Sequence, residues 1–176
     1  DRHSTTVLYD ADGEFTFHIS CKDLAGNLAE VYPEDHFIID LTPPNLEITN
    51  IWNKSANNQE VAPGICYFDE NLNPEAVMIE LIGAGTGPVT LETQSNLIPG
   101  GQMIQYKDFP RTKEMDDLYT LVASVSDLAG NVSEETVLFS VNRFGSTYQF
   151  DSATQEALDR YYLNGPASLK VTEMNV

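Results

Sequence analysis

Carboxylates are the side chains of this sequence whose number and spacing could do chemistry. Asp10, Asp12 and Glu14 alternate in one short stretch that superficially resembles the start of a calcium-binding loop. In the helix–loop–helix type of calcium site, a bidentate Glu occupies the last position of the loop, about twelve residues from the first ligand. Counted from Asp10, that position is Cys21, so this type of site is excluded. Asp10 and Asp12 remain candidate ligands of a calcium site of another kind.

A second set of candidate oxygen ligands lies where an apolar strand end runs into an acidic loop. Asp69 and Glu70 follow an aromatic pair directly, and Asp40 ends an earlier apolar run. Calcium takes about six to eight oxygen ligands, which the loop and the run could supply if folding brings them together. The alternative is that these acids only form a solubilising surface. Calcium is thus a candidate ligand, and no other cofactor is expected.

Two aromatic residues are candidates for contact with a ligand such as a glycan. Trp52 is the only tryptophan of the chain, and Tyr106 lies in a later β-prone segment. Aromatic side chains carry a large apolar area, so they serve both in binding surfaces and in cores. Packing in the core is therefore the competing interpretation of Trp52.

The motifs that would support an enzymatic activity are incomplete. The glycine-rich residues 83–87 follow a β-prone segment, but Pro88 and more β-prone sequence come next, where a phosphate-binding loop needs a helix. This loop is interpreted as a flexible connection between strands. The three histidines form no His-x-His or Glu-x-x-His pair, and the sequence contains no Gly-x-Ser-x-Gly motif. Cys21 alternates with apolar residues and is predicted to be a buried small hydrophobe. The sequence therefore predicts no catalytic residue and no enzyme.

The charge of the chain restricts its partners. Its 176 residues include 27 acidic and 9 basic side chains, a formal net charge of −18. The phosphates of a nucleic acid and an anionic membrane surface would both repel such a chain. Hydrophobic residues make up 41% of the sequence, enough for a packed core, and no apolar run approaches the roughly 18 residues of a membrane-spanning helix. We expect no nucleic-acid partner and no direct membrane insertion, in a chain that is either cytoplasmic or part of a longer exported protein.

An internal repeat indicates how the chain is organised. The pentapeptide Asp-Leu-Ala-Gly-Asn at 23–27 returns unchanged at 127–131, a period of 104 residues. Upstream of the two copies, apolar and polar residues alternate in the same way at 15–21 and at 119–125. Alternation with period two places one set of side chains on one face of a strand. Each copy is therefore predicted to be a strand, a glycine-containing turn and a returning strand.

A repeat of this length corresponds to one immunoglobulin-like sandwich of about 100 residues. Short β-prone segments separated by turn residues, with almost no helical periodicity, indicate an antiparallel sandwich. In the complete unit they span 46–50, 61–68, 76–82, 89–93, 103–109, 118–126 and 134–141. The predicted fold class is all-β: an antiparallel immunoglobulin-like sandwich in a tandem array, with one short helix near the C-terminus.

The repeat divides the chain into three parts. Residues 1–41 match only the C-terminal strands of a truncated unit, with strands expected at 5–9, 14–21 and 31–40. Residues 42–142 form a complete domain. Residues 143–176 form a linker, a helix expected at 153–163 after Ser152 as N-cap, and the first strand of a further unit at 169–174.

The truncated unit has apolar side chains but no opposing sheet to cover them. Phe15, Phe17 and Ile19 lie on one face of its second strand. An uncovered apolar face seeks a partner. We expect this partner to be a neighbouring immunoglobulin-like domain, the C-terminal segment, or a second copy of the chain in a dimer.

The repeated pentapeptide, followed by the strand end Ile-Ile-Asp-Leu-Thr-Pro-Pro at 38–44, resembles bacterial immunoglobulin-like repeat domains of Gram-positive cell-surface proteins. The resemblance covers about residues 15–142. It implies exported, often wall-anchored proteins in which such modules are spacers or stalks and some are adhesive. We therefore expect an extracellular, non-enzymatic stalk module. The alternatives are an adhesive or carbohydrate-binding module with a host or glycan ligand, and an accessory domain of a larger extracellular enzyme.

Overall fold

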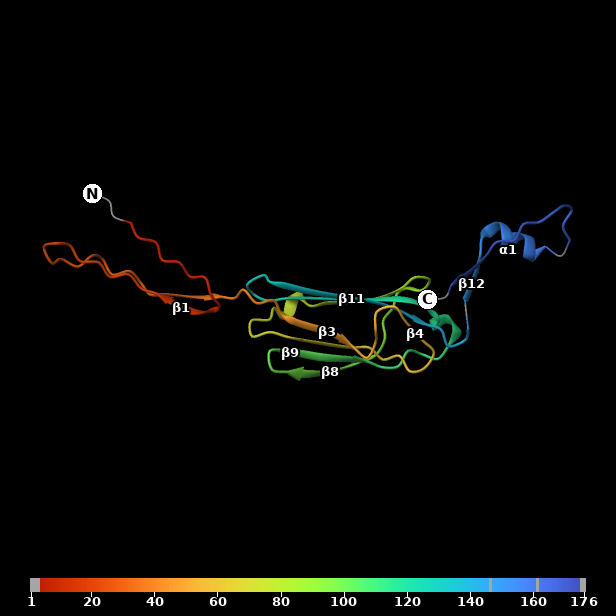
Figure 1. The fold of residues 1–176 in the computed structure, drawn as a ribbon, viewed down its shortest axis with the longest axis horizontal. Coiled ribbons are helices and arrows are strands. Elements are labelled where there is room, and N and C mark those ends of the chain that lie inside the picture. Colours follow the sequence, from red (N-terminus) through yellow and green to blue (C-terminus); the bar gives the residue numbers. More distant parts are fainter. Residues whose placement is uncertain (1–3, 146, 161, 175–176) are drawn as a thin grey trace.

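The computed structural model describes residues 4–145, 147–160 and 162–174. A two-stranded hairpin, a β-sandwich and a small region with one helix follow one another along the long axis of the molecule (Figure 1). Two sheets of antiparallel strands form the sandwich, and one short parallel pairing, between β4 and β11, is added at an edge. The prediction of an all-β sandwich with one short helix is confirmed. In the described part of the chain, no helix is long and apolar enough to cross a membrane.

The sandwich consists of a four-stranded and a five-stranded sheet. The first has the order β3 (Asn45–Thr49), β5 (Gly64–Phe68), β9 (Gly101–Tyr106) and β8 (Thr93–Ile98). The second has the order β4 (Ser55–Asn57), β11 (Val132–Val141), β10 (Asp117–Ser126), β6 (Met78–Gly83) and β7 (Gly87–Pro88). Single-turn 3-10 helices, η1 (Pro74–Ala76) and η2 (Lys113–Met115), precede β6 and β10.

The core lies between the two sheets and is centred on β10. Side chains along this strand alternate strictly in burial, and the inward set is fully covered: Tyr119, Leu121, Ala123 and Val125. Ile65 and Tyr67 of β5 belong to the same core from the opposite sheet. Each large apolar side chain buried in this way stabilises the fold by about 1.5–3 kcal/mol. The alternation in the sequence therefore predicted the inward face of this strand correctly.

An aromatic cluster lies on one face of the N-terminal hairpin. The hairpin consists of β1 (Gly13–Phe17), β2 (Asp35–Ile39) and the segment that connects them. The rings of Phe15 and Phe37 stack with centroids 5.6 Å apart, and Tyr9 meets both edge-on at 5.0 Å. Such edge-on and stacked pairs stabilise beyond their buried area by about 0.5–1.5 kcal/mol each. The cluster ties the segment before β1 to the hairpin.

The same aromatic arrangement recurs inside the sandwich. Tyr119 and Phe139 stack at 5.7 Å with an interplanar angle of 27°, close to the 26° of the hairpin pair. Phe109 meets both rings edge-on, at 4.9 and 6.0 Å. All three rings of the sandwich are at most 1% exposed. The hairpin is therefore built like β10–β11, but without a second sheet over it.

Within the first 41 residues, the strands are shorter than predicted. No strand forms at 5–9, and β1 ends at Phe17 although alternation continues to Cys21. Cys21 is exposed, so its assignment as a buried hydrophobe is wrong. The physical reason is that no opposing sheet covers this segment, so alternation alone does not bury its side chains.

The predictions for edge strands and for the C-terminal region need correction. The strand predicted at 89–93 is replaced by β7 and by β8, which begins at Thr93. The helix α1 (Ser152–Asp159) ends before 163, and its N-cap is Asp151, whose carboxylate accepts from the Thr154 N–H at 2.8 Å. β13 (Val171–Met174) lies within the predicted strand at 169–174. It pairs with β12 (Thr147–Phe150), which falls in a stretch interpreted as linker.

A buried arginine ties the end of β11 to the sandwich. The Arg143 side chain is 4% exposed and pairs with Asp108, and it also donates to the carbonyl oxygens of Gln59 and Phe109 at 2.9 and 2.6 Å. Burial disfavours the ionised Asp108, but hydrogen bonds from the Val61 N–H and from Arg143 outweigh it and lower the pKa of this carboxyl. Asp108 also pairs with Arg111 at 3.5 Å, but the Arg111 side chain is 60% exposed, so Arg143 is the buried partner of this carboxylate. Removing the buried partner of a charge costs more than the pair contributes.

We predict that Arg143→Met lowers the free energy of unfolding by about 3 kcal/mol, because Asp108 loses its buried counterion and keeps only the exposed Arg111. Urea denaturation measures the change. Arg160→Met is the control, since Arg160 pairs with Glu156 on an exposed helix surface and such pairs contribute at most about 0.5 kcal/mol. Equal effects of the two substitutions would contradict the role of Arg143.

Candidate functional site at the joint

Three carboxylates meet at the joint, which we define as residues 40–44 between β2 and β3 together with the loops around them. Asp40 comes from the end of the hairpin, Asp69 follows β5, and Asp127 follows β10. One oxygen from each lies within 4.8 Å of the other two. The sequence offered Asp40 and Asp69 as candidate ligands of one site if folding brings them together, and the structure does so. The prediction missed Asp127, although this residue opens the repeated pentapeptide and that repetition was the available signal.

Two asparagines attach the end of the hairpin to the sandwich. The Asn71 side-chain amide donates to the Asp40 carboxylate at 2.7 Å, and the Asn131 amide donates to the Asp40 carbonyl at 2.9 Å. Further along the two segments, the Ser133 hydroxyl donates to the Pro44 carbonyl at 2.6 Å. Each bond of this kind contributes about 0.5–1.5 kcal/mol. The joint is therefore held by direct polar contacts and not by chain connectivity alone.

Asp127 is held in its ionised form despite being 2% exposed. Burial works against the charge, but the side-chain amide and backbone N–H of Asn131 donate to its two oxygens at 2.7 and 2.8 Å. Further backbone donors contribute, so the pKa of Asp127 lies below its ordinary value. At neutral pH this carboxylate therefore remains a charged group inside the joint.

Asp12 and Glu70, two more of the predicted calcium ligands, lie at the same joint. Both line a pocket of about 400 Å³ that also contains Asp40 and Asp69. Asp12 accepts from the Leu41 N–H and from the hydroxyl of the next residue, at 2.8 and 2.6 Å, and these bonds lower its pKa. It therefore fastens the base of the hairpin to the joint. The fifth predicted calcium ligand, Asp10, does not line this pocket.

The oxygen chemistry of the joint suits a hard divalent cation. Carboxylate and amide oxygens are ligands that calcium prefers, whereas histidine and cysteine would indicate softer metals. Asp40, Asp69 and Asp127 supply three of the oxygens that calcium needs, and mutual repulsion of these charges is relieved when a cation binds. Calcium at this joint stays a prediction, with Asp127 added to the ligands expected from the sequence.

We predict that calcium raises the free energy of unfolding by about 3 kcal/mol at a hundredfold excess over its dissociation constant. Thermal unfolding in calcium and in EDTA measures this. Asp69→Asn removes one of the three clustered charges and should abolish most of the gain. Asp10→Asn is the matched control and should leave it intact. Identical unfolding of the wild-type protein in calcium and in EDTA would contradict the prediction.

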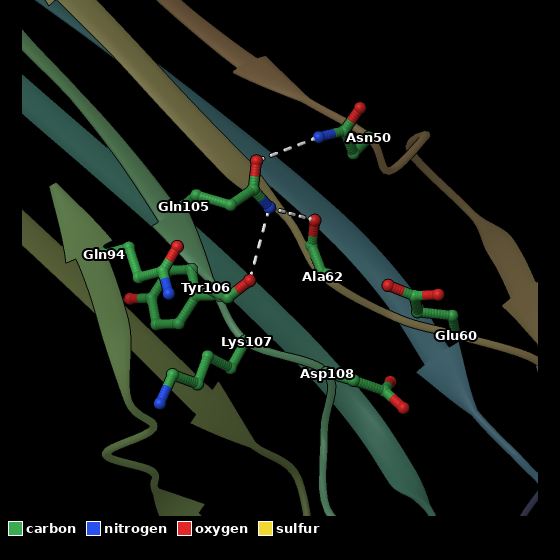
Figure 2. Close-up of a pocket in the computed structure, with 8 residues that line it drawn as sticks. All are labelled: Asn50, Glu60, Ala62, Gln94, Gln105, Tyr106, Lys107 and Asp108. Atoms are coloured by element: carbon green, nitrogen blue, oxygen red, sulfur yellow. Dashed lines mark hydrogen bonds between the residues drawn. The ribbon is translucent and has the colours of Figure 1, made fainter. Parts of the chain in front are cut away.

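A second pocket, of about 560 Å³, opens beside the end of β9 (Figure 2). The amide of Gln105 lies at its centre, where it donates to the carbonyl oxygens of Ala62 and Pro63 and accepts from Asn50 at 3.1 Å. Acidic side chains of Glu60 and Asp108 stand at one side of it (Figure 2). The central amide is therefore occupied by bonds within the fold.

The two aromatic residues predicted to contact a ligand lie in different surroundings. Tyr106 lines the second pocket, but it is 8% exposed and belongs to the core, and burial raises its pKa. Trp52 is 75% exposed, so its interpretation as a core residue is wrong. It does not line the pocket that contains Tyr106. The structure does not combine the two in one pocket.

The glycine-rich loop at 83–87 binds a carboxylate of the same chain. The backbone N–H groups of Gly85 and Thr86 donate to the Asp117 carboxylate at 2.9 and 2.8 Å, and the Thr86 hydroxyl donates at 3.0 Å. Asp117 is 6% exposed. The loop is therefore fixed by these bonds, which corrects its interpretation as a flexible connection. Its amides are occupied and not open to a phosphate.

The repeated motifs and the two packed sheets define an immunoglobulin-like module. A family model described as a bacterial Ig-like domain matches residues 2–40 and 85–141, together more than half of the chain. The chain belongs to this family of bacterial Ig-like domains. A search of the curated proteins and a search of the solved structures gave no match.

Proposed function

We propose that this chain is a non-enzymatic spacer, or stalk, segment of an extracellular protein on the surface of a Gram-positive bacterium. The observation that carries the proposal is the joint, where Asp40 of one repeat unit is bonded by Asn71 and Asn131 of the next. The parts follow one another in line (Figure 1), so each further unit would add to the reach of the molecule. The charge of −18 would keep neighbouring stalks apart and soluble.

The proposal includes the division of the chain into a truncated unit at 1–41, a complete domain at 42–142, and a segment at 143–176 that leads into a further unit. Phe15 and Phe17 are half-buried in the hairpin, while their repeat equivalents Tyr119 and Leu121 are completely covered. An apolar face of this kind is stable when a second sheet covers it. A sheet of a neighbouring part of the array, equivalent to β3–β5–β9–β8, is the partner we propose; a dimer through the truncated units is the alternative.

We predict that the joint is stiff and that Asn71→Ala loosens it, because this substitution removes the donor to the Asp40 carboxylate. Spin labels at cysteines replacing His18 and Asn96, with both native cysteines replaced by alanine, report the distance between hairpin and sandwich by pulsed electron resonance. The wild-type chain should give one narrow distance distribution and the Asn71→Ala chain a broader one.

The exposed Asn58, in the loop after β4, provides the matched control, since Asn58→Ala should leave the distribution narrow. A broad distribution for the wild-type chain would contradict the proposed function, because a freely hinged segment does not hold a distance. A distribution that Asn71→Ala leaves unchanged would contradict the role of this contact.

A second candidate function, adhesion to a glycan, is favoured by one observation, the exposure of Trp52. A tryptophan that is 75% exposed offers a flat apolar surface for stacking. In this case we predict a positive signal on a glycan array that Trp52→Ala abolishes. Tyr162→Ala is the control, because this ring is 86% exposed in the C-terminal segment. A signal that survives Trp52→Ala, or no signal at all, contradicts this candidate.

A further inference from the structure

The two copies of Asp-Leu-Ala-Gly-Asn form the same bend. In the hairpin, the Asn27 backbone N–H and side-chain amide donate to the Asp23 carboxylate at 2.7 and 2.8 Å. In the sandwich, Asn131 donates to Asp127 in the same two ways, at 2.8 and 2.7 Å. The local structure of the pentapeptide therefore does not depend on whether a second sheet covers its unit.

The backbone of the two bends agrees as well. Gly26 and Gly130 have φ angles of +94° and +95°, in the region where a side chain causes strain. Each donates its N–H to the carbonyl of the aspartate that opens the bend, at 3.1 and 3.4 Å. The bends are equivalent parts of two units, which permits a comparison of what each one contacts.

In the sandwich, the bend has a second contact beyond its own bonds. The Asn131 amide carries two N–H groups, and besides Asp127 it donates to the Asp40 carbonyl at 2.9 Å. Asp40 is the end of the strand that arrives from the preceding hairpin. The bend thus binds the terminal strand of the unit before it, through a main-chain carbonyl.

In the hairpin, the second N–H of the Asn27 side-chain amide has no acceptor among the described residues. Among the described residues, Asp23 is the one acceptor of the Asn27 side-chain amide, and both residues are exposed. Asp127, by contrast, is 2% exposed at the joint. Nothing in the described part of the chain occupies the position at the hairpin bend that Asp40 occupies at the sandwich bend.

We infer that the bend at 23–27 is a docking surface for the last strand of a preceding immunoglobulin-like unit, whose terminal carbonyl would accept the free N–H of Asn27. The partner is identified by the chemistry of residues 38–44: an apolar strand that ends in aspartate and continues through Thr-Pro-Pro. The inference rests on the proposed function, and it adds a specific contact by which successive units would be joined.

The first test uses matched substitutions in the existing chain. Asn131→Asp and Asn27→Asp each remove the side-chain bond inside the bend and keep the backbone one, but only Asn131→Asp also removes the donor to Asp40. With the spin labels described above, Asn131→Asp should lose the narrow distance distribution across the joint, and Asn27→Asp should keep it. Equal effects would overturn the comparison on which the inference depends.

The second test gives the hairpin bend its partner. Joining residues 1–108 directly to residues 9–176 places the second Tyr9 where Phe109 stands in the sandwich, since the two have the same place in the aromatic clusters. The joined chain contains a hybrid unit. In it, β3 to β9 of the first copy stand together with β1 and β2 of the second copy, which take the places of β10 and β11. Its bend at the second Asn27 then faces the strand end of the first Asp40.

Spin labels at the first copies of residues 18 and 96 in the joined chain report the distance across the new joint. We expect a narrow distribution that is lost when the second Asn27 is changed to Asp and kept when the first Asn27 is changed. A narrow distribution insensitive to the second Asn27 overturns the inference while the proposed function stands. A broad distribution for the joined chain also overturns it, because the bend at the second Asn27 then does not hold the preceding strand end.

Discussion

An antiparallel strand pair has one apolar face, and this face is stable in water only when another layer covers it. In the sandwich, β10 and β11 satisfy this requirement through the sheet β3–β5–β9–β8, and the inward side chains of β10 are fully buried. The hairpin has the same strand pair and the same aromatic cluster without the covering sheet. Its half-buried rings show which contact the hairpin lacks in the described part of the chain.

The joint follows from where the strand pairs end. Loops after β5 and β10 meet the segment that leaves β2, so residues from distant parts of the sequence gather at one end of the sandwich. Asparagine amides bind the acidic strand end there and compensate part of its charge. Because these bonds run from the sandwich to the end of the hairpin, the polar residues of the joint connect the two parts directly.

Much of the fold could be predicted from the sequence, because strands with one buried face show alternation. Residues 118–126 and 134–141 lie in β10 and β11, and the strand predicted at 46–50 overlaps β3. Two other edge strands, β4 and β8, escaped prediction for the opposite reason. Both consist mostly of polar residues, and β8 is mostly exposed, so neither period nor hydrophobicity marks them. Cys21 shows the converse error, an alternating pattern without a sheet to bury it.

The site could be predicted only in part. Asp40 ends an apolar run before Thr-Pro-Pro, and Asp69 follows an apolar strand end, which marked them as candidate ligands. Asp127 and Asn131 were visible as members of a repeated bend, but their contacts with Asp40 depend on how two units are placed in space. A single sequence does not contain that placement. The repeat marked both residues as parts of a turn, and only the structure placed them at the site and gave their partner.

We propose that hairpin and sandwich form one rigid spacer through the bonded joint. Residual dipolar couplings of backbone amides in both parts, measured on the intact chain in a weakly aligning medium, test it most directly. We expect both sets to fit a single alignment tensor with the same magnitude and orientation. Two tensors of different magnitude would mean that the units move independently, and the account of a stiff stalk would be contradicted.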